Sequence, residues 1–162
     1  MSSVEAALRF LHILAATAWL GAALFFVAVL NPAIARSAGD GLATLRLLAT
    51  RSRIQLYMPL VAGLTVGLGL LLYLATDAHA SYADGQLRIL NGGATLGVVA
   101  LLYGALAEGR TTKAIARAAG APGDGPDAKE LPRLVRRLRT QGHVSTVLLV
   151  LALGAMATFR AW

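Results

Sequence analysis

One histidine lies inside a long apolar stretch near the start of the chain. His12 falls within the stretch from Phe10 to Ala35, which contains no Asp, Glu, Lys or Arg. An ionisable side chain in such surroundings is rare and marks a candidate site. Because neutral imidazole is the commonest metal ligand, His12 is a candidate axial ligand for haem b or for another metal centre. The alternative is a structural histidine that is hydrogen-bonded to a neighbouring helix, for example at Asn91.

Trp19 and a pair of glycines extend this candidate site. Trp19 follows His12 by seven positions, so both side chains share one face of a helix. Gly92 and Gly93 occur in a later apolar stretch, at about the depth of His12. Glycines clear a helix surface for close packing, and a flat cofactor would use the same clearance. We therefore predict a cofactor pocket that comprises His12, Trp19, Asn91, Gly92 and Gly93, with helix packing as the alternative interpretation of the glycines.

The two other histidines are weaker candidate metal ligands. His79 follows Asp77 in a polar segment, where a solvated loop is the alternative to a copper site. His143 begins the last apolar stretch, where the alternative is a polar residue at the membrane interface. The first and last stretches run in opposite directions, so His12 and His143 lie near opposite membrane faces, ~20 Å or more apart. One haem iron therefore cannot bind both.

The elements that position these residues are predicted to be membrane-spanning helices. Only 14% of the 162 residues are charged, against about 25% in soluble domains. A helix needs roughly 20 apolar residues to cross the hydrocarbon core of a bilayer, and only helices or closed barrels satisfy their backbone there. Four stretches meet that length or come close to it, at about residues 8–35, 54–76, 89–107 and 142–160. The predicted fold is an all-α bundle of four transmembrane helices.

The distribution of positive charge predicts the direction of the spans. Three of the fifteen Lys and Arg residues fall on the side of the two termini, and the other twelve fall in segments 36–53 and 108–140. The positive-inside rule places these two segments in the cytoplasm and both termini outside, in the bacterial inner membrane. The net charge of +7 is concentrated beside apolar spans, so the expected partner is anionic lipid head groups and no nucleic acid is expected.

An internal repeat is predicted from two similar segments. Residues 33–39 (AIARSAG) recur as residues 114–120 (AIARAAG), a displacement of half the chain. The repeat halves would be 1–81 and 82–162, and each half would form one helical hairpin. Two spans in each unit make the repeats parallel, related by an axis along the membrane normal.

The alignment of the halves singles out residues that occur in the first half only. His12 aligns with Gly93, and Trp19 aligns with Ala100. These two positions are therefore not required to build a hairpin, which favours a functional role for them. Outside the spans, helical periodicity predicts two basic extensions, one over residues 40–53 and one that starts at Asp127.

The first span resembles a known family of membrane proteins. Its motif runs from Leu11-His12 through Trp19-Leu20-Gly21 to Asn31-Pro32. It is similar to the opening helix of the copper-resistance protein D-like membrane proteins and of the HemJ-type protoporphyrinogen oxidases. The resemblance implies a four-helix membrane bundle linked to copper or haem, with His12 as the first-helix histidine. The third span carries neither the lysine nor the histidine of a HemJ-type enzyme, so whether the chain is an enzyme stays open.

Three functional hypotheses follow from these features. The first is a haem-binding protein linked to membrane redox chemistry through His12. The second is a copper-handling protein that uses His12, His79 and Asp77, although the chain has no Cys and only three Met to supply soft sulfur ligands. The third is a non-catalytic accessory or scaffold subunit in a homo-oligomer or a larger membrane complex.

Overall fold

The protein is a bundle of four long helical segments. The computed structural model describes residues 2–36, 53–77, 82–120 and 126–159, and no strand occurs among them. The helices are α1 (Ser3–Phe25), η1 (Phe26–Leu30), α2 (Asn31–Arg36), α4 (Ile54–Ala75), α6 (Asp84–Tyr103), η2 (Gly104–Glu108), α7 (Gly109–Gly120) and α8 (Pro126–Thr158). The predicted all-α fold is confirmed.

Local contacts fix where two of these helices begin and end. Ser2 and Glu5 form a capping box at the start of α1, in which each side chain accepts a hydrogen bond from the other residue's backbone N–H, both at 3.2 Å. The backbone leaves the helical conformation after α4 at Asp77, whose φ of 43° lies in the left-handed region. Aspartate tolerates this conformation better than most residues, so the helix end is encoded locally.

Four helical segments in the described part of the chain are long and apolar enough to cross a bilayer, as expected of a multi-pass membrane protein. They are Ser3–Ile34, Gln55–Ala75, Asp84–Ala118 and Glu130–Thr158. Large apolar side chains cover their outer faces, and lipid tails would solvate such surfaces where water would not. The number of predicted spans is confirmed.

The helices extend further than the predicted spans on one side. The segment 108–140, which we predicted as a cytoplasmic loop, is helical up to Gly120 and again from Pro126. The reason is an apolar seam outside the spans, where Ile115 and Ala118 of α7 are buried against Leu131 of α8. The predicted extension of the last helix from Asp127 is thus confirmed. The predicted extension over residues 40–53 lies outside the described residues except for its final position.

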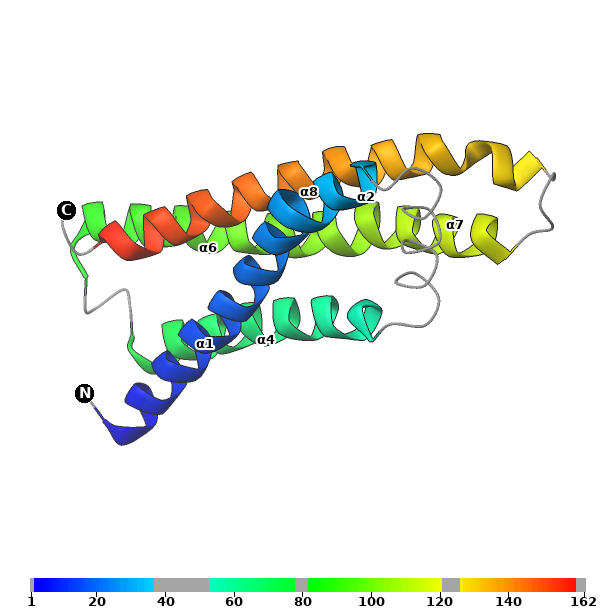
Figure 1. The fold of residues 1–162 in the computed structure, drawn as a ribbon. Coiled ribbons are helices and arrows are strands. Elements are labelled where there is room, and N and C mark those ends of the chain that lie inside the picture. The colour runs from blue at the N-terminus through cyan, green and yellow to red at the C-terminus, as the bar shows by residue number, and fades with distance from the viewer. Residues whose placement is uncertain (1, 37–52, 78–81, 121–125, 160–162) are drawn as a thin grey trace.

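The helices pack as two antiparallel pairs. α1 packs obliquely on α4 and then crosses to α8, whereas α6 with α7 runs along α8 (Figure 1). The start of α1 and the end of α8 lie at one end of the bundle, and the end of α7 lies at the other (Figure 1). This pairing is the one that two helical hairpins would give, although the sequence repeat itself stays a prediction.

The common core is small and contains one large side chain. It comprises Trp19, Ala23, Val61, Ala62, Ala100 and Leu149, which come from all four helical segments. Trp19 and Ala100, which the predicted repeat aligns with each other, therefore lie in the same cluster. The small residues let the four backbones approach closely around the indole.

A short π-helix interrupts the first helix of each pair. In η1 the N–H of Asn31 bonds to the carbonyl of Phe26, and in η2 the N–H of Gly109 bonds to that of Gly104. Both bonds span five residues instead of the four of a regular helix. Each segment inserts one extra residue into its turn and so rotates the helix that follows it. π-helical turns of this kind occur frequently at functional sites.

Candidate functional site

His12 lies against α4, where one hydrogen bond fixes its ring. Its Nδ1 is 2.8 Å from the backbone carbonyl oxygen of Thr65. A carbonyl oxygen only accepts, so Nδ1 carries the proton that is donated. In the neutral ring the lone pair then lies on Nε2, which has no hydrogen-bond partner among the described residues. The backbone of α4 thus selects the tautomer whose Nε2 is free to bind a metal.

Gly69 provides the space that the imidazole ring occupies. A Cβ atom at this position would lie 2.8 Å from Cε1 of His12 and 3.2 Å from Nδ1, closer than side chains pack. In a regular helix the Thr65 carbonyl also accepts the N–H of Gly69, and a carbonyl oxygen has two lone pairs. Gly69 therefore lets the ring reach an oxygen that a larger residue would cover. We had not singled out Gly69 as a site residue.

Trp19 shares the face of α1 on which His12 lies, as predicted. It is 6% exposed and packs in the core with Val61 and Ala62 of α4. Because the two helices are antiparallel, Trp19 meets the part of α4 before Thr65. The two turns between His12 and Trp19 separate them by about 10 Å along the helix. Trp19 anchors the helix pair that presents His12.

The three predicted pocket residues of α6 have other surroundings. A Cβ at Gly93 would lie 3.1 Å from Cβ of Ala155 and 3.2 Å from the carbonyl oxygen of Ala152, so Gly93 packs closely on α8. A Cβ at Gly92 would have nothing within 4 Å. Asn91 is exposed, and its carbonyl accepts a hydrogen bond from the hydroxyl of Thr95. The neighbouring-helix partner of His12 is the backbone of α4.

Of the other two histidines, the structure describes His143, which lies far from His12. His143 is exposed, and its Nδ1 is 2.7 Å from the carbonyl oxygen of Arg139 in its own helix. The adjacent Gly142 lies beside Val27, which follows His12 by 15 positions, or about 22 Å of helix. His79 lies outside the described residues. Within the described ranges, no three His, Asp or Glu side chains gather in a group that could hold a metal ion.

A second polar group lies between η2 and α8. The hydroxyl of Ser145 donates a hydrogen bond of 2.5 Å to Oε1 of Glu108. Two further polar residues are buried, Thr111 one turn later in α7 and Gln141 one turn earlier in α8. We had placed Glu108 just outside the third span, since it ends the uncharged stretch. The signal in the sequence is the return of apolar periodicity after it, at Ala114, Ile115 and Ala118.

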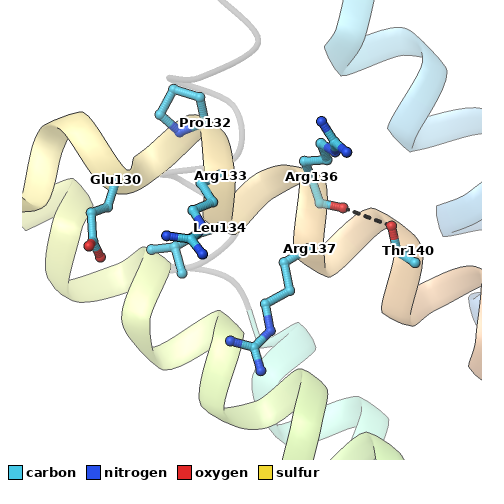
Figure 2. Close-up of a pocket in the computed structure, with 7 residues that line it drawn as sticks. All are labelled: Glu130, Pro132, Arg133, Leu134, Arg136, Arg137 and Thr140. Atoms are coloured by element: carbon cyan, nitrogen blue, oxygen red, sulfur yellow. Dashed lines mark hydrogen bonds between the residues drawn. The ribbon is translucent and has the colours of Figure 1, made fainter.

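The basic start of α8 borders an open cleft of about 960 Å³. Figure 2 shows the lining residues, which are Glu130, Pro132, Arg133, Leu134, Arg136, Arg137 and Thr140. Arg133, Arg136 and Arg137 are all exposed within little more than one helical turn, and guanidinium groups are suited to binding phosphate. A smaller cavity of about 300 Å³ lies between α7 and α8 and is lined in part by Arg110, Thr111 and Arg137.

Comparisons with known proteins do not assign the chain to a family. No family model matches the chain, and neither a curated protein nor a solved structure does. The resemblance to the copper- and haem-linked proteins therefore rests on the sequence alone, with the first helix as its only motif.

The chemistry of the histidine site follows from its geometry. An imidazole with Nδ1–H bound to a carbonyl and Nε2 free is the usual arrangement of a metal-binding histidine and its outer-shell partner. The hydrogen bond restricts rotation of the ring and determines which of its two nitrogens is available as a ligand. The site offers one strong nitrogen ligand in apolar surroundings.

Proposed function

We propose that the chain is a multi-pass protein of the bacterial inner membrane that binds haem b through Nε2 of His12 and takes part in membrane redox chemistry. The observation that supports this function is the 2.8 Å contact between Nδ1 of His12 and the Thr65 carbonyl. It leaves a single, oriented nitrogen ligand in the spanning part of the bundle. Haem supplies one-electron chemistry at its iron when it is bound.

A single histidine suffices for haem because the porphyrin supplies the other four nitrogen ligands. Globins and peroxidases hold haem iron by one proximal histidine. The clearance at Gly69 and the bond to Thr65 fit that role, since both hold the ring in one orientation. Protein copper sites combine several imidazole or sulfur ligands. Around His12 the described residues offer one imidazole, which favours haem over copper.

The surroundings of His12 also suit an apolar macrocycle. Leu11 and Phe10 of α1 and Leu70 of α4 are all more than two-fifths exposed, so this helix pair presents apolar side chains on its outer surface at the level of His12. Lipid tails cover such a surface in a membrane and exclude water from it. A low dielectric there favours the binding of a neutral imidazole to a large apolar ligand.

The absorption spectrum of the purified protein tests this proposal. Protein from cells supplied with a haem precursor is expected to show a Soret band that shifts on reduction, and His12→Ala is expected to lose it. His143→Ala is the matched control and should keep the band, because His143 bonds only to its own helix. A wild-type protein without a Soret band would refute haem binding. Copper that co-purifies with the wild type and not with His12→Ala would instead favour the copper hypothesis.

We also propose that the basic end of the bundle faces the cytoplasm and contacts anionic head groups. Arg133, Arg136 and Arg137 line one open cleft, and each basic residue near an anionic surface contributes about 1 kcal/mol. Both chain ends then lie outside, since the start of α1 and the end of α8 share the opposite end of the bundle (Figure 1). Binding to vesicles with and without phosphatidylglycerol tests the lipid contact. Equal binding to both would refute it.

A further inference from the structure

Glu108 is an acidic residue in a helix that is apolar enough to span a membrane. It is the last residue of η2 and falls within the candidate span Asp84–Ala118. Its Oε1 accepts the hydroxyl of Ser145 from α8. In the described part of the chain, no Lys or Arg nitrogen lies within 4.0 Å of its carboxylate. A carboxylate in a spanning helix without a positive partner is costly and marks a site by default.

On α8, one turn from the hydrogen-bond partner of Glu108, the side-chain oxygen of a buried glutamine lacks a hydrogen-bond donor. Gln141 is 6% exposed, and its Oε1 has no hydrogen-bond partner. Gln141 lies one turn before Ser145, so both side chains belong to the face of α8 that packs on η2 and α7. Buried acceptors of this kind are almost always satisfied, so the exception requires an explanation. The amide oxygen and the carboxylate both need a positive charge or a donor.

The side chain of Thr111 adds a further oxygen to this group of polar residues. It is 3% exposed and lies one turn after Glu108, on the side of the helix that faces α8. Its hydroxyl proton is donated to the carbonyl of Ala107 at 3.0 Å, which leaves the oxygen lone pairs free. Ser145 lies opposite Glu108, to which it is hydrogen-bonded. Because α8 runs antiparallel to this helix, one turn back from Ser145 on α8 corresponds to one turn forward from Glu108. Gln141 is therefore expected opposite Thr111.

We propose that Glu108, Thr111, Gln141 and Ser145 bind one Na⁺ ion between η2 and α8. Carboxylate, amide and hydroxyl oxygens are the ligands that hard cations take. One carboxylate neutralises one positive charge, whereas a divalent ion would leave a net charge in an apolar setting. Arg110 and Arg137 line the adjoining cavity of about 300 Å³, and their repulsion discriminates against divalent ions more strongly than against monovalent ones.

The local backbone suits such a site. The π-helical turn rotates Glu108 relative to the helix before it, and its second carboxylate oxygen, Oε2, lies beside Gly104. The cavity that borders Thr111 is also lined by Arg110 and Arg137. This site is independent of His12, so its test needs no bound haem.

Labelling with dicyclohexylcarbodiimide tests the proposal on the full-length protein in detergent. This reagent modifies protonated carboxyl groups in apolar surroundings, and peptide mass spectrometry locates the product. We expect modification of Glu108 that Na⁺ slows several-fold, while K⁺ and choline at the same ionic strength do not. Modification that proceeds equally in all three salts would overturn the site, as would the absence of modification.

Two variants separate a bound cation from a general effect of salt. Gln141→Leu removes the amide oxygen at similar volume, so Glu108 should still be modified but lose its protection by Na⁺. Gln86→Leu is the matched control, because Gln86 only accepts a bond from the backbone of Ala83 at the start of α6. It should keep the protection. Retention of protection in Gln141→Leu would overturn the proposed ligand set even where the wild type responds to Na⁺.

Discussion

Replacement of Gly69 by alanine tests the geometry of the histidine site most directly. The new Cβ would lie 2.8 Å from Cε1 of His12 and 3.2 Å from Nδ1, so the ring must move away. Movement breaks the bond to Thr65, which contributes about 1 kcal/mol, and the crowding costs about 1–3 kcal/mol. The better helix propensity of alanine returns about 1 kcal/mol. We therefore expect the free energy of unfolding to fall by about 1–3 kcal/mol.

The same substitution is expected to weaken haem binding. Loss of an outer-shell hydrogen bond to a metal-binding histidine typically lowers metal affinity 10- to 100-fold, about 1–3 kcal/mol. Titration of haem-free protein, followed at the Soret band, measures this change, and thermal unfolding of the haem-free protein measures stability. Gly67→Ala is the matched control on the same helix, because a Cβ at Gly67 would meet nothing within 4 Å.

A double-mutant cycle separates the contact with His12 from other effects of the substitution. In a His12→Ala background the added methyl group has no ring to displace, so Gly69→Ala should become neutral or slightly stabilising. If Gly69→Ala is as stable as Gly67→Ala in the wild-type background, or is equally destabilising with and without His12, the proposed contact is wrong.

Three further predictions concern the core, the packing of α6 and the topology. Trp19→Ala should lower the free energy of unfolding by about 3–5 kcal/mol in a denaturation assay, because it removes the one large side chain of the common core. Gly93→Leu should destabilise the protein strongly through its contacts with α8, whereas Gly92→Leu should change stability little. The chain has no cysteine, so single-cysteine variants report topology without background. An impermeant thiol reagent added to intact spheroplasts should label Ser2→Cys and leave Lys113→Cys unlabelled, and the reverse pattern would invert the proposed orientation.

The sequence predicts the spans well because a bilayer imposes a simple rule on composition. An uncharged apolar stretch of sufficient length has few alternatives to a helix, so four spans could be counted directly. The ends were harder to predict, since Glu108 and Arg110 interrupt the apolar stretch without ending the helix. The helix continues because Ile115 finds an apolar partner on α8, and this is a contact between segments distant in the sequence.

The candidate site could be predicted only in part, for a related reason. The position of His12 within an apolar span identifies it from sequence alone. Its partner is a backbone carbonyl, which every residue possesses, so no residue type marks Thr65 as the acceptor. Gly69 becomes significant only once the register between α1 and α4 is known. The clearest sequence clue would be the pairing of a buried polar residue with a glycine on the adjacent antiparallel span.

The continuity of α8 has a mechanical consequence. From Arg133 to Thr158 the helix spans 26 residues, or about 39 Å, which exceeds the ~30 Å hydrocarbon core. The exposed arginines and the buried residues Gln141 and Ser145 therefore belong to one uninterrupted helix. If the arginines contact anionic head groups as proposed, a change in head-group charge would act on the same helix that carries Gln141 and Ser145. A displacement of α8 would change its separation from η2 and therefore the hydrogen bond between Ser145 and Glu108.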